Sequence, residues 1–133
     1  METTKTINSP FDEQTLQYFK ELLLEKRREA EQQEAQVEEN ISNLNEADDA
    51  DQSSIAHHMG DFGSDTEEKQ LNYQFLERTR KYINQINDAL QRIEDGTYGI
   101  CKATGNPIAK GRLESVPHTR YSIEAKEQGL DHE

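Results

Sequence analysis

The sequence predicts a mainly α fold, in which a long antiparallel coiled-coil hairpin precedes a small finger-like domain and a short C-terminal helix. Of its 133 residues, 32% are hydrophobic and 32% are charged, and none is Trp. This supply of apolar residues is thin for a globular core but suits long helices that bury one narrow stripe. Glu, Gln, Lys, Arg, Leu and Ala dominate, and all of these favour helix.

The first helix is expected over about 11–45, after a flexible N-terminus at residues 1–10. Ser9-Pro10 marks its start, and Asp12 and Glu13 fall in the first turn, where the helix dipole favours negative charge. No Gly or Pro interrupts residues 11–59. The apolar residues that recur every seven positions are Leu16, Leu23, Ala30, Val37 and Leu44.

A second heptad pattern predicts a helix over about 65–94, which Ser64 or Asp65 can cap and Asp95-Gly96 ends. Its apolar positions are Leu76, Ile83 and Leu90, with Ile86 and Ile93 in the alternate row. Two long helices with narrow seams predict a hairpin over 11–95 with a tip loop at about 46–65. Two helices of a small bundle are the alternative.

Charge is strongly acidic and concentrated around the predicted tip. The formal net charge is −12, and thirteen acidic residues without one Lys or Arg lie between Glu29 and Glu68. Phosphates repel such a chain, so direct DNA binding is not expected. The ordinary interpretation of the acidic run is a solvated helix face, whereas a functional one is steering of the tip into a basic channel.

The compartment is predicted from what the sequence contains. A single Cys permits no internal disulfide, which fits a reducing cytosol. No apolar run approaches a membrane span, and the first ten residues lack a signal-peptide core. We therefore expect a soluble cytoplasmic protein without a membrane partner.

Residues 96–133 have the spacing of a four-cysteine zinc finger but only one of its cysteines. The four positions are Cys101, Thr104, Ser122 and Ala125, paired across two-residue gaps. Hydroxyls are weak zinc ligands and Ala is none, so the sequence predicts a degenerate finger with zinc lost, no cofactor and no metal site. Cys101 is then expected to be a small buried hydrophobe. The residues available for the finger core are Ile100, Ile108, Leu113, Val116, Tyr121 and Ile123.

The stretch IEDGTYGICKATGNPIAKGRLESVPHTRYSIEAK resembles the C-terminal finger of the DksA/TraR family of bacterial RNA polymerase-binding transcription regulators. The resemblance covers roughly residues 55–127. Three of the four cysteine positions depart from the family pattern. The positions in register are Asp95, Gly96, Tyr98, Gly99, Cys101, Gly105, Ile108, Arg112, Leu113 and Pro117.

The resemblance implies a transcription regulator that binds RNA polymerase through its secondary channel, with the acidic tip directed at the active centre. Asp61 falls on one aspartate of the family's D-x-x-D-x-A tip motif, whereas His58 and Gly63 stand at two of its other positions. Ser64 and Asp65, after Gly63, match another branch of the family. His58, Asp61, Ser64 and Asp65 are therefore the predicted tip residues, and a monomer is expected.

Binding of the alarmone ppGpp is not assigned to this chain. Lys126 matches one basic position that responsive family members use, as a possible nucleotide contact. Gln85 and Val116 stand where two other basic residues would lie. A highly charged nucleotide needs several cations.

The alternative function is a structural, dimerising coiled coil, for which Tyr18, Leu22 and Leu24 offer apolar residues outside the seam. An enzyme is not expected, because no catalytic triad, phosphate loop or metal quartet is present. The adjacent pair His57-His58 in an acidic loop is typical of a solvated segment.

Overall fold

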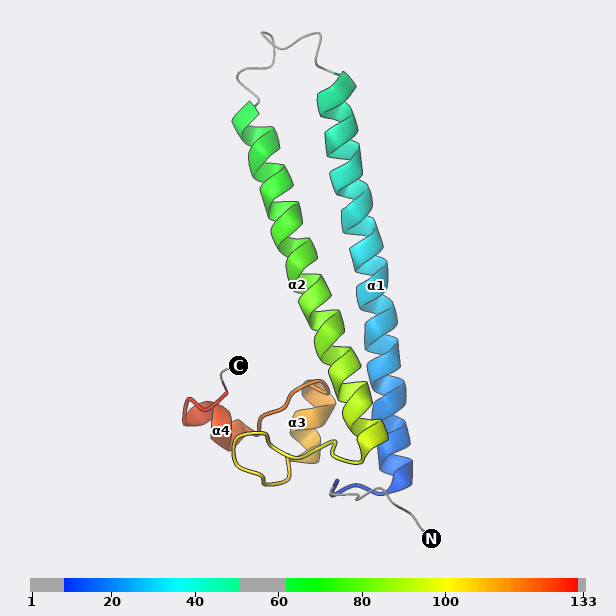
Figure 1. Ribbon diagram of the computed structural model, residues 1–133, viewed down its shortest axis with the longest axis vertical. Helices are drawn as coiled ribbons and strands as arrows, with labels where there is room; N and C mark the ends of the chain where they lie inside the picture. The colour runs from blue at the N-terminus through cyan, green and yellow to red at the C-terminus, as the bar shows by residue number, and fades with distance from the viewer. Residues whose placement is uncertain (1–8, 51–61, 132–133) are drawn as a thin grey trace. The chain divides into compact units, whose positions relative to one another are not determined.

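The computed structural model describes residues 9–50 and 62–131, and the side chains of 47–50 and 62–66 are not described. Within these limits the chain is helical, with an isolated antiparallel bridge between Ile100 and Pro107. The mainly α prediction is thus confirmed (Figure 1). The helices are α1 (Glu13–Ala50), α2 (Phe62–Asp95), α3 (Lys110–Ser115) and α4 (Ile123–Glu127).

Asp12 caps the start of α1. Its Oδ1 accepts a hydrogen bond from the Thr15 amide at 2.8 Å, and its carbonyl accepts one from the Leu16 amide at 2.9 Å. Hydrogen bonds from Thr15 hold the pKa of the Asp12 carboxyl below its ordinary 3.8. The sequence predicts that Asp12 lies in the first turn of the helix. In the structure Asp12 instead lies just before the first turn as its cap, and Glu13 begins the helix.

Both long helices extend further toward the predicted tip than the sequence suggested. α1 continues to Ala50 instead of about 45, since no Gly or Pro interrupts it, and α2 begins at Phe62 instead of about 65. Gly63 falls in the first turn of α2, where little of the helix lies before it. The predicted tip loop of about 46–65 is therefore too long.

The end of α2 is the predicted one. The Gly96 amide donates to the Ile93 carbonyl at 3.2 Å and the Thr97 amide to the Arg92 carbonyl at 2.9 Å. Gly96 has φ 81°, a conformation that glycine adopts without a Cβ clash. This pair of bonds is the Schellman arrangement that closes a helix C-terminus.

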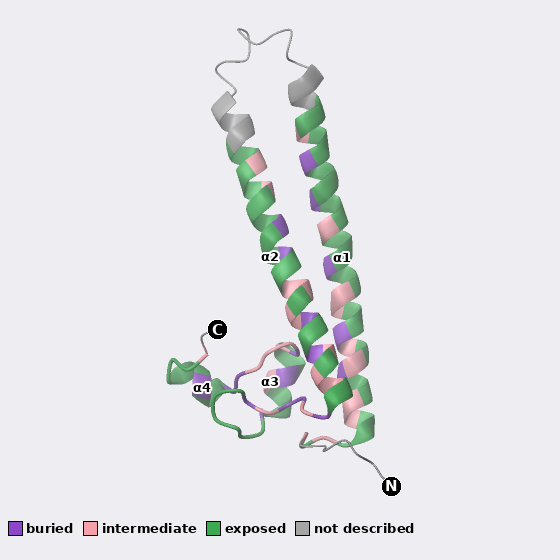
Figure 2. Cartoon of the chain, in the orientation of Figure 1, coloured by how far each residue is buried: buried purple, intermediate pink, exposed green. Residues whose placement is uncertain are grey.

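The chain divides into two compact units, and residues 28–83 form one of them. Val37 and Ile41 of α1 pack with Leu76 of α2 in its buried cluster. Arg80 of α2 pairs with Glu34 at 2.9 Å and with Glu38. The helices in this unit are antiparallel and joined along the predicted heptad seam, with buried side chains on the facing sides (Figure 2).

Residues 1–27 and 84–133 form the other unit, in which the start of α1 lies beside the end of α2. Arg27 Nη1 donates to Asn87 Oδ1 at 2.7 Å, and Lys20 pairs with Glu94 at 3.6 Å. Residue numbers fall along α2 as they rise along α1, so this pairing is antiparallel too. The fully buried side chains of the two helices here are Phe19, Leu23, Ile86 and Ala89.

An aromatic cluster joins the N-terminal segment, α1 and the finger in this unit. The ring centroid of Phe11 lies 5.6 Å from that of Phe19 and 6.5 Å from that of Tyr98, and the Phe19 and Tyr98 rings are 5.5 Å apart. The Ser9 amide donates to the Gly96 carbonyl at 3.0 Å. The finger is thus packed on the base of the helix pair through residues about 80 positions apart in the sequence.

The core of the finger only partly follows the sequence prediction. Ile108, Leu113 and Tyr121 are buried as expected. Ile123 is 47% exposed, because it is the first residue of α4, whereas Ala125 two positions later is fully buried. The described helices contain no stretch long and apolar enough to span a membrane.

Candidate functional site: the finger and the hairpin surface

The four positions with zinc-finger spacing converge in the structure. The Cys101 amide donates to the Asn106 carbonyl, and the Gly105 amide donates back to the Cys101 carbonyl, both at 2.8 Å. The Lys102 amide donates to the Arg120 carbonyl at 2.7 Å, which joins this loop to the second half of the finger. The loop and α4 therefore meet at Cys101.

Ser122 contacts the Cys101 sulfur through two groups. Its amide lies 3.4 Å and its hydroxyl 3.5 Å from Cys101 Sγ, and its Oγ accepts a hydrogen bond from the Ala125 amide at 3.1 Å. Ser122 is also the N-cap residue of α4. One serine thus caps the helix and contacts the thiol.

Cys101 is buried, as predicted, at 1% exposure. Burial raises the pKa of its thiol, but hydrogen bonds from Thr104 and Ser122 lower it more, to about 6. These bonds favour the thiolate at neutral pH, so Cys101 is more polar than the small buried hydrophobe that the sequence suggested. The zinc-finger spacing indicated that Cys101, Thr104 and Ser122 would lie close together, but it did not indicate that the two hydroxyl residues would hydrogen-bond to the thiol.

A buried tyrosine anchors the finger beside the loop that carries Cys101. The Tyr98 hydroxyl donates to the Pro117 carbonyl at 2.8 Å, and Tyr98 is fully buried. Burial raises the pKa of Tyr98, so the phenol remains protonated as the hydrogen-bond donor.

The residues considered for nucleotide contact do not form a cationic site. Lys126 is exposed on α4. Gln85 lines a small cavity of about 110 Å³ with His118 and Arg120, but Lys126 does not line it. Arg120 in this cavity already pairs with Asp88 at 3.3 Å.

The predicted tip residues are not placed by the structure. His58 and Asp61 lie outside the described residues. Ser64 and Asp65 belong to the first turn of α2, and their side chains lie outside the described part of the chain. The roles predicted for all four therefore stay predictions.

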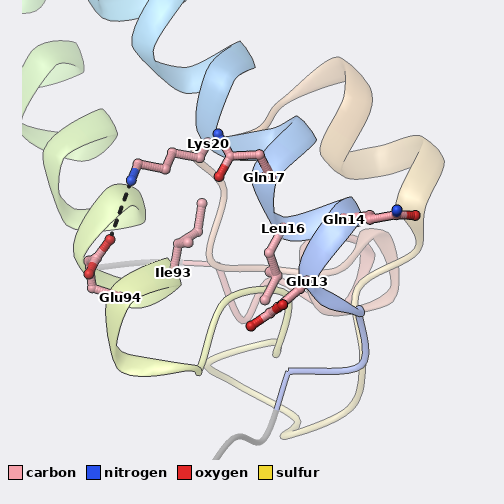
Figure 3. Close-up of a pocket in the computed structure, with 7 residues that line it drawn as sticks. All are labelled: Glu13, Gln14, Leu16, Gln17, Lys20, Ile93 and Glu94. Carbon is pink, nitrogen blue, oxygen red and sulfur yellow. Dashed lines mark ion pairs between the residues drawn. The ribbon is translucent and has the colours of Figure 1, made fainter.

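An open groove of about 410 Å³ lies between the start of α1 and the end of α2 (Figure 3). The Lys20–Glu94 ion pair crosses it, and Leu16 and Ile93 supply its apolar lining. None of the predicted site residues lines this groove.

Sequence reasoning missed a group of exposed apolar residues on α2. Leu71 is 65% exposed, Tyr73 51% and Phe75 41%. The available signal was their position outside the heptad row of Leu76 and Ile83, which predicts side chains that do not enter the seam.

The finger matches a known family of zinc-binding domains. Residues 96–128 match the model of the prokaryotic dksA/traR C4-type zinc finger. This match contradicts the prediction of a finger without a cofactor, which is therefore wrong for this type of domain: zinc is the metal that the family implies.

The donor set explains why residue chemistry alone suggested otherwise. The four positions offer one thiol, two hydroxyls and a methyl group, which do not fit a four-thiolate site. No group of three or more His, Cys, Asp or Glu residues that could hold a metal occurs among the residues that the structure describes.

The wider comparisons cover most of the chain. An RNA polymerase-binding transcription factor DksA from Caulobacter vibrioides is 37% identical over 124 residues, which are 91% of this chain and 80% of that protein. General stress protein 16O of Bacillus subtilis is 38% identical over 72 residues, 54% of this chain and 44% of that one. The structure of transcription factor DksA2 from Pseudomonas aeruginosa matches with a TM-score of 0.77 at 32% identity, over 89% of this chain and 84% of the other. The chain therefore belongs to the DksA/TraR family.

Proposed function

We propose that this protein is a bacterial transcription regulator that binds RNA polymerase through its secondary channel, without binding DNA and without catalysis of its own. The observation that carries the proposal is the 37% identity, over most of both chains, to a factor whose name states RNA polymerase binding. The match to the DksA2 structure over 89% of the chain supports the same architecture.

The charge supports a protein partner over a nucleic-acid one. A net charge of −12 opposes binding to a phosphate backbone. The same charge favours approach to a basic protein channel, whose field can steer an acidic hairpin during association. The thirteen acidic residues from Glu29 to Glu68 lie in the part of the sequence that enters such a channel first.

The length of the helices supports a mechanism in which the hairpin extends through the secondary channel toward the active centre. The 38 residues of α1 correspond to about 57 Å at 1.5 Å per residue. In the proposed complex, helix surfaces provide affinity, and the carboxylates of Asp61 and Asp65 approach the catalytic magnesium or the basic loops around it. Water is excluded there, so each charge interacts more strongly than on an exposed helix.

The proposal is tested by separating regulation from binding. We expect Asp61→Asn and Asp65→Asn to reduce the effect on transcription in vitro at least fivefold while polymerase affinity changes less than twofold. Glu31→Gln is the matched control, because Glu31 is an exposed α1 carboxylate, whereas Glu38 pairs with Arg80. In vitro transcription and a binding competition with homologous polymerase measure the two quantities.

Two outcomes of this experiment contradict the proposal. Failure of the unaltered protein to bind polymerase would exclude the function itself. Normal regulation by the bound Asp variants would show that the tip carboxylates only add solubility.

A structural, dimerising coiled coil is the second candidate, since Tyr18 is 48% and Leu24 36% exposed on α1. Leu22, the third residue considered for dimerisation, is partly buried. Light scattering distinguishes the candidates, because the polymerase-binding proposal expects a monomer at micromolar concentration.

A further inference from the structure

The heptad seam of α2 becomes polar toward the start of the helix. The row that carries Ile93 and Ile86 near the end of α2 continues backward as Thr79 and Asn72. Thr79 is buried and Asn72 is half-buried, and the Asn72 amide nitrogen donates at 2.8 Å to the Glu68 carbonyl of its own helix. The unit formed by residues 28–83, which we call the tip half, thus has polar side chains at seam positions that are isoleucine in the other unit.

The buried core of the tip half is also small. Its cluster consists of Val37, Ile41 and Leu76. Apolar burial is the main force that holds paired helices together. Among the described residues of the helix pair, the large side chains that are fully buried all belong to the other unit, and they are Phe19, Leu23 and Ile86.

Charge opposes helix pairing in the tip half. Residues 28–83 include fourteen acidic and five basic residues, against thirteen and ten in the rest of the chain. An excess of one sign destabilises a compact state through self-repulsion. The tip half therefore combines the smaller apolar core with the stronger repulsion.

Arg80 joins the two helices of the tip half through two carboxylates. Its Nε lies 2.9 Å from Glu34 Oε2, and its Nη2 pairs with Glu38, which lies one turn further along α1. One guanidinium thus neutralises two acidic side chains of α1, an arrangement that we call the Arg80 clasp. Isolated surface ion pairs contribute little to stability, but loss of Arg80 would also leave both carboxylates unneutralised in an acidic unit.

We propose that the tip half opens locally, with its two helices separating while the other unit stays folded, and that the Arg80 clasp sets how often it opens. Parts of one protein open with different free energies, and the elements that move in function come from the least stable of them. The proposal concerns the free protein. It is therefore tested without RNA polymerase, and it fails or stands independently of the proposed function.

Amide hydrogen exchange of the full-length protein, followed by mass spectrometry and corrected for intrinsic rates, tests the proposal. We expect residues 34–46 and 67–83 to exchange at least tenfold faster than residues 16–27 and 84–93, with similar protection throughout the two faster segments. Arg80→Gln is expected to speed exchange about three- to tenfold in both tip-half segments and to leave the other two unchanged.

Two further variants separate the clasp from a general effect of charge. Lys81→Gln removes the same charge one position further on, but Lys81 is exposed and forms no ion pair with a described residue. Exchange should change less than twofold. Thr79→Val replaces the buried hydroxyl with a methyl group, and because burial of a hydroxyl opposes the closed seam, exchange in both segments should slow about three- to tenfold.

Three results would overturn the inference. Equal protection in all four segments would show that the hairpin opens as a whole. Exchange that rises steadily toward Ala50 and Phe62 would show fraying of the helix ends in place of a unit that opens together. Equal effects of Arg80→Gln and Lys81→Gln would show that net charge, and not the clasp, sets the opening.

Discussion

The glycine that precedes the finger loop offers a direct test of how the finger is attached. Gly99 has φ 91°, and a Cβ at this position would lie 2.6 Å from Cε2 and 3.1 Å from Cδ2 of Phe11. Carbon atoms in contact are normally about 3.5–4.0 Å apart. Gly99→Ala therefore forces the Phe11 ring away from Phe19 and Tyr98 and strains the backbone as well.

The expected loss in the free energy of unfolding is the sum of two effects. The left-handed backbone costs an Ala residue about 1–2 kcal/mol. Displacement of Phe11 weakens two aromatic contacts, with centroid separations of 5.6 and 6.5 Å, each worth about 0.5–1.5 kcal/mol. We expect Gly99→Ala to destabilise the protein by about 2–5 kcal/mol.

A double-mutant cycle with Phe11→Ala isolates the steric contribution. Without the ring, Gly99→Ala should cost only the backbone strain, so the coupling energy should be about 1–3 kcal/mol. Urea unfolding followed by tyrosine fluorescence measures it, since the chain has five Tyr and no Trp. A coupling below about 0.5 kcal/mol would refute the packing of Phe11 over Gly99.

Two further predictions concern the same unit of the protein. Tyr98→Phe removes the donor of the buried 2.8 Å hydrogen bond to the Pro117 carbonyl, and urea unfolding should show a loss of about 1–2 kcal/mol; an unchanged midpoint would contradict this contact. The folded-state pKa of Asp12 is lowered by Thr15, so its capping contribution is present above the ordinary 3.8 and is lost as pH falls below it. The NMR shift of the Thr15 amide should titrate in that acidic range in the wild type and not in Asp12→Asn.

The heptad rows predicted the helix pair because burial follows spacing within one helix. Leu23, Val37, Leu76 and Ile86 are buried as their periodicity indicates. Periodicity does not reveal which polar residue enters the seam, so the buried Thr79 was not foreseen. The helix ends toward the tip were misplaced because Asn and Asp weaken helices without stopping them.

The finger was less predictable, since its contacts join residues far apart in the sequence. Phe11 and Phe19 pack with Tyr98 only because the N-terminal segment runs beside the end of α2. The zinc-finger spacing brought Cys101 and Ser122 together, but it did not predict that Ser122 would donate hydrogen bonds to the thiol. Residue chemistry at the four finger positions led to the prediction of no cofactor, which the C4-type family match contradicts.

The exposed apolar residues of α2 show another limit of prediction from the sequence. The exposed Leu71 and Phe75 were present in the sequence, but their meaning depends on which flank of the helix faces α1. That orientation is fixed by Leu76 in its cluster with Val37 and Ile41.

Insertion of the tip into the polymerase channel is measured most directly by cleavage from the active centre. When Fe²⁺ replaces the catalytic magnesium of homologous RNA polymerase and hydrogen peroxide is added, the iron reduces the peroxide to hydroxyl radicals there, which cut only nearby backbone. Cleavage of end-labelled protein is predicted between the end of α1 at Ala50 and the start of α2 at Phe62, with the finger residues intact. Cleavage in the finger, or no polymerase-dependent cleavage of the bound protein, would contradict an active-centre-directed hairpin.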